Sequence, residues 1–153
     1  MSVEARLKEL GITVPEAPKP VAAYVPFVRS GDLVFTSGQI CMENGQLKHK
    51  GKVGAEVTPE EGYQAARLCA INTLAVLKSA IGDLEKVAQI VKVTVFVNSA
   101  AGFTGQPAIA NGASELYSQV FGDLGKHARS AVGVSELPMG STTEVEVIAR
   151  VQG

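Results

Sequence analysis

Tryptophan is absent from the 153-residue sequence, and cysteine and histidine occur only twice each. The sequence has no Cys-x-x-Cys or His-x-x-His spacing, so we predict no structural zinc or other metal site. No run of residues approaches the ~18 consecutive apolar positions that a membrane span needs. The segment 2–10 is charged and lacks the apolar core of a secretory signal peptide. These absences predict a cytoplasmic protein with no membrane partner.

An excess of basic charge is also missing, because 14 Lys and Arg residues stand against 15 Asp and Glu residues and the net charge is -1. Proteins that bind nucleic acid usually present a basic stripe, often with stacking aromatic residues. The nearest candidate is the stretch Lys48–Lys52, which we interpret as a solvated loop. We therefore predict no nucleic-acid partner, and the charge argues against a ribonuclease that binds RNA tightly at physiological salt.

Apolar residues, by contrast, are abundant: 46% of the chain is hydrophobic and only 19% is charged. Its length fits one ordinary domain. We predict a single domain over residues 1–153, in which residues 1–20 form an N-terminal helix and a proline-containing arm. The apolar excess either fills a large core or forms a surface that a partner subunit covers.

Hydrophobic periodicity predicts a mixed order of strands and helices, and hence an α+β fold. The clearest local signal is Thr58-Pro59-Glu60-Glu61, where the threonine caps a helix, the proline occupies its first position and Glu61 completes a capping box. Cys69 falls within the apolar pattern of that helix, so we expect a buried free thiol. The predicted strands cover residues 22–28, 33–38, 90–97, 128–136 and 142–151, with a weaker strand over 40–47, and the predicted helices cover 58–81 and 107–121.

The two long helices are predicted to pack on one face of a mixed sheet. In the last strand, Ile148 alternates onto the opposite face, together with Glu144, Glu146 and Arg150. A sheet cannot leave much apolar surface in water, so we expect identical subunits to cover this face.

Two strands carry the residues that could do chemistry. Arg129 shares a face with Ala131 and Gly133, whose small size leaves open space beside the guanidinium. A guanidinium can hold a carboxylate through two parallel hydrogen bonds, and a glutamate such as Glu144 can accept a proton or orient water. The spacing is compatible with a small-anion pocket, but alone it favours an ordinary cross-strand salt bridge between this arginine and a glutamate.

Several segments resemble the reactive intermediate deaminase family, the YjgF-like family once labelled endoribonuclease L-PSP. Thr36-Ser37-Gly38-Gln39-Ile40 resembles the family's TSGQ segment. The C-terminal part contains, in order, Arg129-Ser130-Ala131-Val132, then Leu137-Pro138, then Glu144-Val145-Glu146, which resembles the family signature RSxV…LP…(V/I)E(V/I)E. The similarity extends from about Pro18 to Val151.

The resemblance implies a chorismate-mutase-like fold and a homotrimer with clefts between neighbouring subunits. Characterised members hydrolyse small 2-imino or enamine acids, such as 2-iminobutanoate and 2-iminopropanoate, to 2-oxo acids and ammonia, without a metal or organic cofactor. By match to the family motifs, Arg129 would bind the substrate carboxylate and Glu144 would help to place the attacking water. Tyr24 would lie near the cleft entrance, and Ser37 and Gly38 would line the cleft.

The chain departs from the family pattern in two places. Many active deaminases have a cysteine two residues after the arginine, where this chain has Ala131 beside the expected substrate. The loop and helix over residues 99–118 are longer than usual, and either Asn111 or Ser114 could replace the asparagine that members often place there. His127, two residues before the arginine, could donate a proton, contact the anion or be an ordinary surface histidine.

The leading hypothesis is a hydrolytic deaminase of small imino acids, whose partners are a carboxylate or imino-acid ligand and further copies of itself. The alternative is a non-catalytic trimer that binds a small carboxylate metabolite in the same clefts. Arg129 serves both functions equally. Glu144 and Ala131 bear more directly on the choice, because activity depends on a placed water and binding alone does not.

Overall fold

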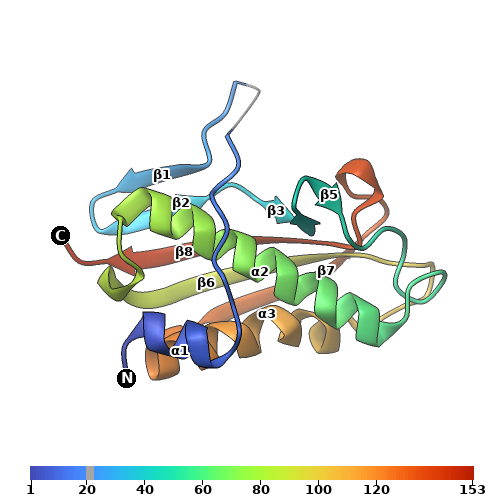
Figure 1. Ribbon diagram of the computed structural model, residues 1–153. Helices are drawn as coiled ribbons and strands as arrows, with labels where there is room; N and C mark the ends of the chain where they lie inside the picture. Colours follow the sequence, from blue (N-terminus) through green and yellow to red (C-terminus); the bar gives the residue numbers. More distant parts are fainter. Residues whose placement is uncertain (20–22) are drawn as a thin grey trace.

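The computed structural model describes residues 1–19 and 23–153, and it confirms the α+β class: a mixed sheet is covered on one face by helices (Figure 1). The sheet order is β1 (Phe27–Ser30), β2 (Leu33–Thr36), β8 (Thr143–Val151), β6 (Val87–Asn98) and β7 (Ala128–Val134), and β3 (Gln39–Ile40) also pairs with β8. β4 (Met42–Glu43) and β5 (Gln46–Leu47) form a separate hairpin. The helices are α1 (Val3–Glu9), α2 (Pro59–Ile81) and α3 (Gln106–Phe121), with short 3-10 turns η1 (Leu84–Lys86), η2 (Gly122–Gly125) and η3 (Pro138–Gly140).

The start of α2 confirms the predicted capping box. The Thr58 hydroxyl accepts a hydrogen bond from the Glu61 amide at 3.2 Å, and the Glu61 carboxylate accepts one from the Thr58 amide at 3.1 Å. The bond from the Thr58 amide is the main reason why the pKa of Glu61 lies below its usual value. Each side chain thus accepts a hydrogen bond from the other residue's backbone amide, which would otherwise be unpaired at the helix start. These two bonds define where α2 begins.

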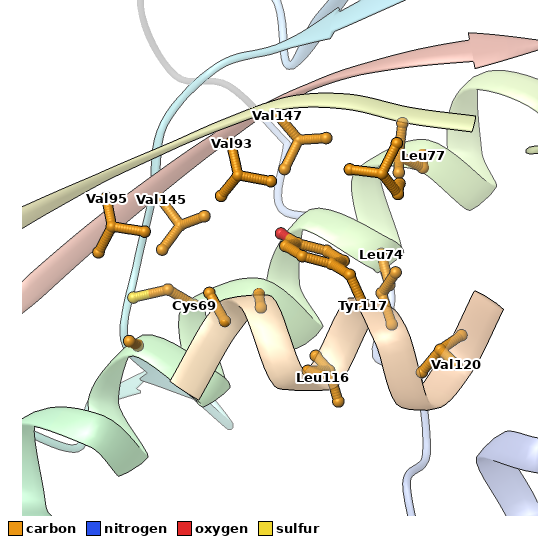
Figure 2. Close-up of a cluster of buried hydrophobic side chains, with 14 of the residues drawn as sticks. Cys69, Leu74, Leu77, Val93, Val95, Leu116, Tyr117, Val120, Val145 and Val147 are labelled. Carbon is orange, nitrogen blue, oxygen red and sulfur yellow. The ribbon is translucent and has the colours of Figure 1, made fainter. Parts of the chain in front are cut away.

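The hydrophobic core lies between the sheet and the two long helices, as Figure 2 shows. Valines of β6 and β8 point toward leucines of α2 and toward the inner side of α3. Tyr117 of α3 is fully buried in this layer, and its hydroxyl meets that of Thr73 at 2.6 Å. The polar tip of the largest buried side chain is therefore satisfied, as burial requires.

The helices α2 and α3 approach each other closely at Gly112. A Cβ atom at this buried position would lie 2.1 Å from the backbone oxygen of Tyr63 and 3.2 Å from the amide nitrogen of Arg67. Only a residue without a side chain fits such a backbone contact. Gly112 therefore sets the distance between the two helices.

The opposite face of the sheet has no helix over it and carries an apolar row, as predicted from Ile148 (Figure 1). Val28 of β1 pairs with Phe35 of β2, which pairs with Ile148 of β8. Val28 is 55% exposed and Phe35 is 39% exposed. We call this the open face; large apolar side chains on it mark it as a surface suited to association.

Several predicted boundaries were wrong in ways that have physical reasons. The strand predicted over residues 22–28 begins only at Phe27, directly after Pro26, because a proline has no amide hydrogen to donate to a neighbouring strand. Residue 22 lies outside the described residues. The weak strand over 40–47 is divided among β3, β4 and β5, because Asn44 and Gly45 both adopt positive φ and reverse the chain.

Both cysteines are free and fully buried. Cys69 packs in α2 as predicted, and Cys41 lies between β3 and β4. A hydrogen bond from the Cys69 thiol, with smaller contributions from Ser141 and nearby backbone, lowers the pKa of Cys41 to about 5, while burial raises that of Cys69. The surroundings of the two buried thiols therefore shift their pKa values in opposite directions.

Candidate functional site

Arg129 is a partly buried cation whose described partners are all neutral. Its Nη1 donates to the Asn111 side-chain oxygen at 2.7 Å and to the Ser114 hydroxyl at 3.2 Å. It forms no ion pair with any residue among 1–19 and 23–153. No described acceptor takes a hydrogen bond from Nε or Nη2, which form the edge of the guanidinium that fits a carboxylate. An uncompensated guanidinium with this edge free is suited to bind an anion.

The position of Arg129 follows from the parallel pairing of β6 and β7. Arg129 lies opposite Val93, a fully buried residue of the core, so its side chain is on the helix-covered face. Asn111 and Ser114 are three residues apart on α3 and therefore share one side of that helix. Sequence analysis left open which of these two residues takes part; the structure brings both to Arg129.

His127 extends this cluster. Its Nδ1 lies 2.6 Å from the Gly125 carbonyl oxygen and its Nε2 lies 2.9 Å from the Ser114 hydroxyl. The edge-on ring of Tyr117 packs against it, with ring centroids 5.8 Å apart. Burial is the main reason why the pKa of His127 lies below its usual value. The positive charge of Arg129 lowers this pKa further.

Glu144 lies on the other face of the sheet. Its neighbours in β8, Val145 and Thr143, face the core, and its own cross-strand partners are Phe96 of β6 and Ile40 of β3. The carboxylate packs over Gly38 so closely that a Cβ there would lie 2.2 Å from Oε1. Burial raises the pKa of Glu144, with a smaller contribution from the charge of the neighbouring Glu146 on the same face.

The expected cross-strand salt bridge between Arg129 and a glutamate is wrong. β6 lies between β7 and β8, so Arg129 and Glu144 are on strands that do not pair. They also lie on opposite faces. The consecutive strands β7 and β8 do not pair, because the long β6 lies between them and pairs with both.

Tyr24 and Gly38 line a groove of about 990 Å³ between the N-terminal arm and α2. Tyr24 is 58% exposed. The hydroxyl of Ser37 does not face a free space; it donates to the Val25 carbonyl at 2.6 Å, and the Ser37 amide donates to Pro26. The predicted residues thus fall into two groups in one protomer: Arg129 with the α3 cluster, and Glu144 with the Tyr24–Gly38 segment.

Sequence reasoning missed Gln106, at the start of α3. Its amide nitrogen donates to the Ser99 hydroxyl at 3.2 Å and to the Phe103 carbonyl at 2.8 Å, and it would lie 2.6 Å from a Cβ at Gly133. Gly133 follows Arg129 and Ala131 on the same face of β7. A glycine inside a strand is the one signal that could have indicated this close approach.

The described part of the chain contains no group of three or more His, Cys, Asp or Glu side chains that could hold a metal ion. Over the same residues, no helix is both long enough and apolar enough to cross a membrane.

Comparisons with known proteins place the chain in one family. The YjgF/chorismate-mutase-like family model matches residues 4–151. Protein TCP17 of Trypanosoma cruzi is 44% identical over 147 residues, covering 95% of this chain and 92% of that protein. A 2-iminobutanoate/2-iminopropanoate deaminase of Dermatophagoides farinae is 30% identical over 141 residues, covering 92% and 95%.

Among solved structures, the protein Atu1372 of Agrobacterium tumefaciens, of unknown function, superposes with a TM-score of 0.93 at 44% identity. The match covers 98% of this chain and 92% of that one. Sequence and fold agree, and the chain belongs to the YjgF/chorismate-mutase-like family, which includes the reactive intermediate deaminases.

Proposed function

We propose that this protein hydrolyses small 2-imino or enamine acids to 2-oxo acids and ammonia, in clefts between the subunits of a cytoplasmic homotrimer. The observation that carries the proposal is Arg129, a partly buried guanidinium with neutral partners and a free Nε–Nη2 edge. A substrate carboxylate would supply the missing negative charge. The deaminase name of the Dermatophagoides relative supports the choice of reaction.

The trimer is part of the proposal because one protomer cannot present both key residues to one ligand. Arg129 lies on the helix-covered face of the edge strand β7, whereas Glu144 lies on the open face. Packing the open face of one subunit beside β7 of the next would bring the two together. The same contact would cover the apolar row of Val28, Phe35 and Ile148.

The chemistry needs few groups. Water adds to the electrophilic imine carbon, the tetrahedral product loses its nitrogen as ammonia, and the carbonyl oxygen of the 2-oxo acid comes from that water. Arg129 would fix the carboxylate, and Glu144 would accept a proton from the water. The raised pKa of Glu144, caused mainly by burial, makes its carboxylate a stronger base than an exposed glutamate.

Ala131 supports a second candidate, in which the trimer binds a small carboxylate without turning it over. This side chain is a methyl group beside Arg129 on the same face of β7, where many active deaminases have a cysteine. Binding through Arg129 requires no thiol there. An assay decides: an amino-acid oxidase generates the imine in place, and faster formation of the 2-oxo acid on adding the protein identifies the enzyme.

The first prediction concerns assembly. Sedimentation equilibrium at micromolar concentration should give three times the mass of one chain, because an exposed apolar row favours burial between subunits. Phe35→Glu, which places a charge in that row, should shift the mass toward the monomer, whereas Glu9→Gln on α1 should leave it unchanged. A wild-type monomer would refute the intersubunit cleft.

The second prediction concerns Glu144→Gln. The variant keeps the shape of the side chain and loses its basicity, so turnover should fall by about 100-fold, the lower range of general acid–base contributions. Carboxylate binding, measured by calorimetry, should change little. Glu146→Gln, two residues further along β8 and on the same face, is the matched control. Normal turnover in Glu144→Gln together with a loss in Glu146→Gln would transfer the role to Glu146.

A further inference from the structure

A chain of hydrogen bonds connects His127 to the guanidinium of Arg129. The Gly125 carbonyl can only accept, so Nδ1 of His127 carries a proton. Nε2 of the neutral ring then accepts the hydroxyl proton of Ser114 at 2.9 Å, and the Ser114 oxygen accepts from Nη1 of Arg129 at 3.2 Å. Each hydrogen bond in this series has one donor and one acceptor that fit the neutral imidazole. The orientation of the Ser114 hydroxyl therefore depends on His127.

We propose that His127 is a positioning residue, which acts through Ser114 on Arg129 and couples anion binding at Arg129 to the uptake of a proton by the imidazole. The inference rests on the proposed anion site and adds that the protonation state of His127 sets the affinity of this site for the anion. It assigns no contact between His127 and the ligand.

The packing around His127 makes the ring a fixed part of the fold. Tyr117 lies edge-on against it and is itself held by Thr73. Gly125 is buried, and a Cβ there would lie 2.1 Å from the Tyr117 backbone oxygen, so the carbonyl that receives Nδ1 is held by a close backbone contact. The imidazole therefore responds to protonation by changing its hydrogen bonds more readily than by moving.

Protonation reverses one of these hydrogen bonds. With a proton on Nε2, the imidazolium donates to the Ser114 oxygen, which then accepts from both His127 and Arg129. The hydroxyl proton of Ser114 must turn away from Nε2, and it becomes available to another acceptor. In the protonated state the site thus gains one positive charge and one free donor, and both favour a bound carboxylate.

The charged groups near His127 leave Arg129 as the main electrostatic influence. On α3, Tyr117 stays neutral because burial raises its pKa, and the carboxylate of Glu115 accepts a hydrogen bond from Tyr63. On the turn before β7, Lys126 pairs with Asp123 at 3.4 Å on the surface. The charge of Arg129 disfavours the imidazolium, and an anion bound there would offset that charge.

The direction of the coupling follows. In the free protein the pKa of His127 is lowered, so the ring is neutral at pH 7. A bound anion raises that pKa, and the affinity for the anion must therefore increase as the pH falls through the interval between the two values. Each unit by which the anion raises the pKa corresponds to a tenfold gain in affinity at low pH.

The test is calorimetric titration with 2-oxobutanoate, which remains ionised throughout, at about pH 5.5 and about pH 8, on either side of the ordinary histidine value. The wild type should bind about 3–10-fold more tightly at the lower pH, given a shift of up to about one unit. Buffers of different ionisation enthalpy should report proton uptake at the lower pH. His49→Gln, which changes the other histidine, should leave both results unchanged.

Two substitutions separate the positioning role from a structural one. Each is made together with Glu144→Gln, because the raised pKa of Glu144 would add a pH dependence of its own in the proposed cleft. His127→Gln places an amide near Nε2, so Ser114 keeps an acceptor; affinity at pH 8 should be near normal, while the pH dependence disappears. His127→Asn keeps the hydrogen bond to the Gly125 carbonyl but loses the hydrogen bond to Ser114, so the affinity for 2-oxobutanoate should fall at both pH values. A pH dependence that persists in His127→Gln overturns this inference alone. Absence of binding by the wild type at either pH overturns the proposed anion site together with it.

Discussion

Replacing Arg129 with alanine is expected to weaken the binding of 2-oxobutanoate by about 10–100-fold. A charged hydrogen bond to a carboxylate contributes about 1.5–3 kcal/mol, and each ~1.4 kcal/mol corresponds to a tenfold change in affinity. The guanidinium has neutral partners on Nη1 and a free edge at Nε and Nη2, so its removal deletes the fork that the anion would use. Calorimetric titration measures the loss directly.

The conservative change Arg129→Lys should recover only part of the affinity, since an ammonium keeps the charge and loses the planar fork. Arg29→Ala is the matched control, because the exposed side chain of this arginine in β1 has the nearby Gly31 carbonyl as its one hydrogen-bond partner among the described residues. The thermal melt of Arg129→Ala should stay close to that of the wild type, because Asn111 and Ser114 can bind water in its place. Normal binding by Arg129→Ala would refute the anchor role, and a collapsed melt would make Arg129 a structural residue.

Gly112→Ala should produce the largest loss of stability. Alanine normally stabilises a helix by about 1 kcal/mol relative to glycine. Here the added methyl group would lie 2.1 Å from the Tyr63 backbone oxygen, so α2 and α3 must separate. Overpacking of this kind costs about 1–3 kcal/mol and sometimes more. For a chain of this size, we expect the melting temperature to fall by about 2–12 °C.

Ser118→Ala provides the control for Gly112→Ala, because it adds no atoms and lies on the same helix at a partly exposed position. Differential scanning calorimetry of the two variants separates a general effect on α3 from the effect of the helix contact. An unchanged or higher melting temperature for Gly112→Ala would show that the two helices can move apart at little cost, and that their spacing is not set by this glycine.

The fold could be predicted largely from local signals. The capping box at Thr58 and the β-branched residues of β6 are local patterns in short stretches of sequence. Both α2 and β6 lie where these patterns predict them. The short strands between Gln39 and Leu47 could not be resolved in this way. Each is only two residues long and is defined by its pairing partner, which a local pattern does not contain.

The sequence named candidate residues for the site but did not predict how they are arranged. Arg129, Asn111, Ser114 and His127 do come together, because β7 and α3 carry them to one place. The separation of Arg129 from Glu144 depends on β6 lying between β7 and β8. Strand order is a long-range property, and consecutive strands in a sequence do not have to pair.

The two-faced sheet has a consequence for mixed assemblies. Because the proposed cleft takes Arg129 from one subunit and Glu144 from the next, Arg129→Ala and Glu144→Gln chains would damage different halves of each cleft. In a trimer that contains both variants, one cleft joins the intact arginine of a Glu144→Gln chain to the intact glutamate of an Arg129→Ala chain. Two impaired proteins, refolded together, should therefore regain up to one third of the wild-type clefts. A site within a single subunit does not allow this form of complementation.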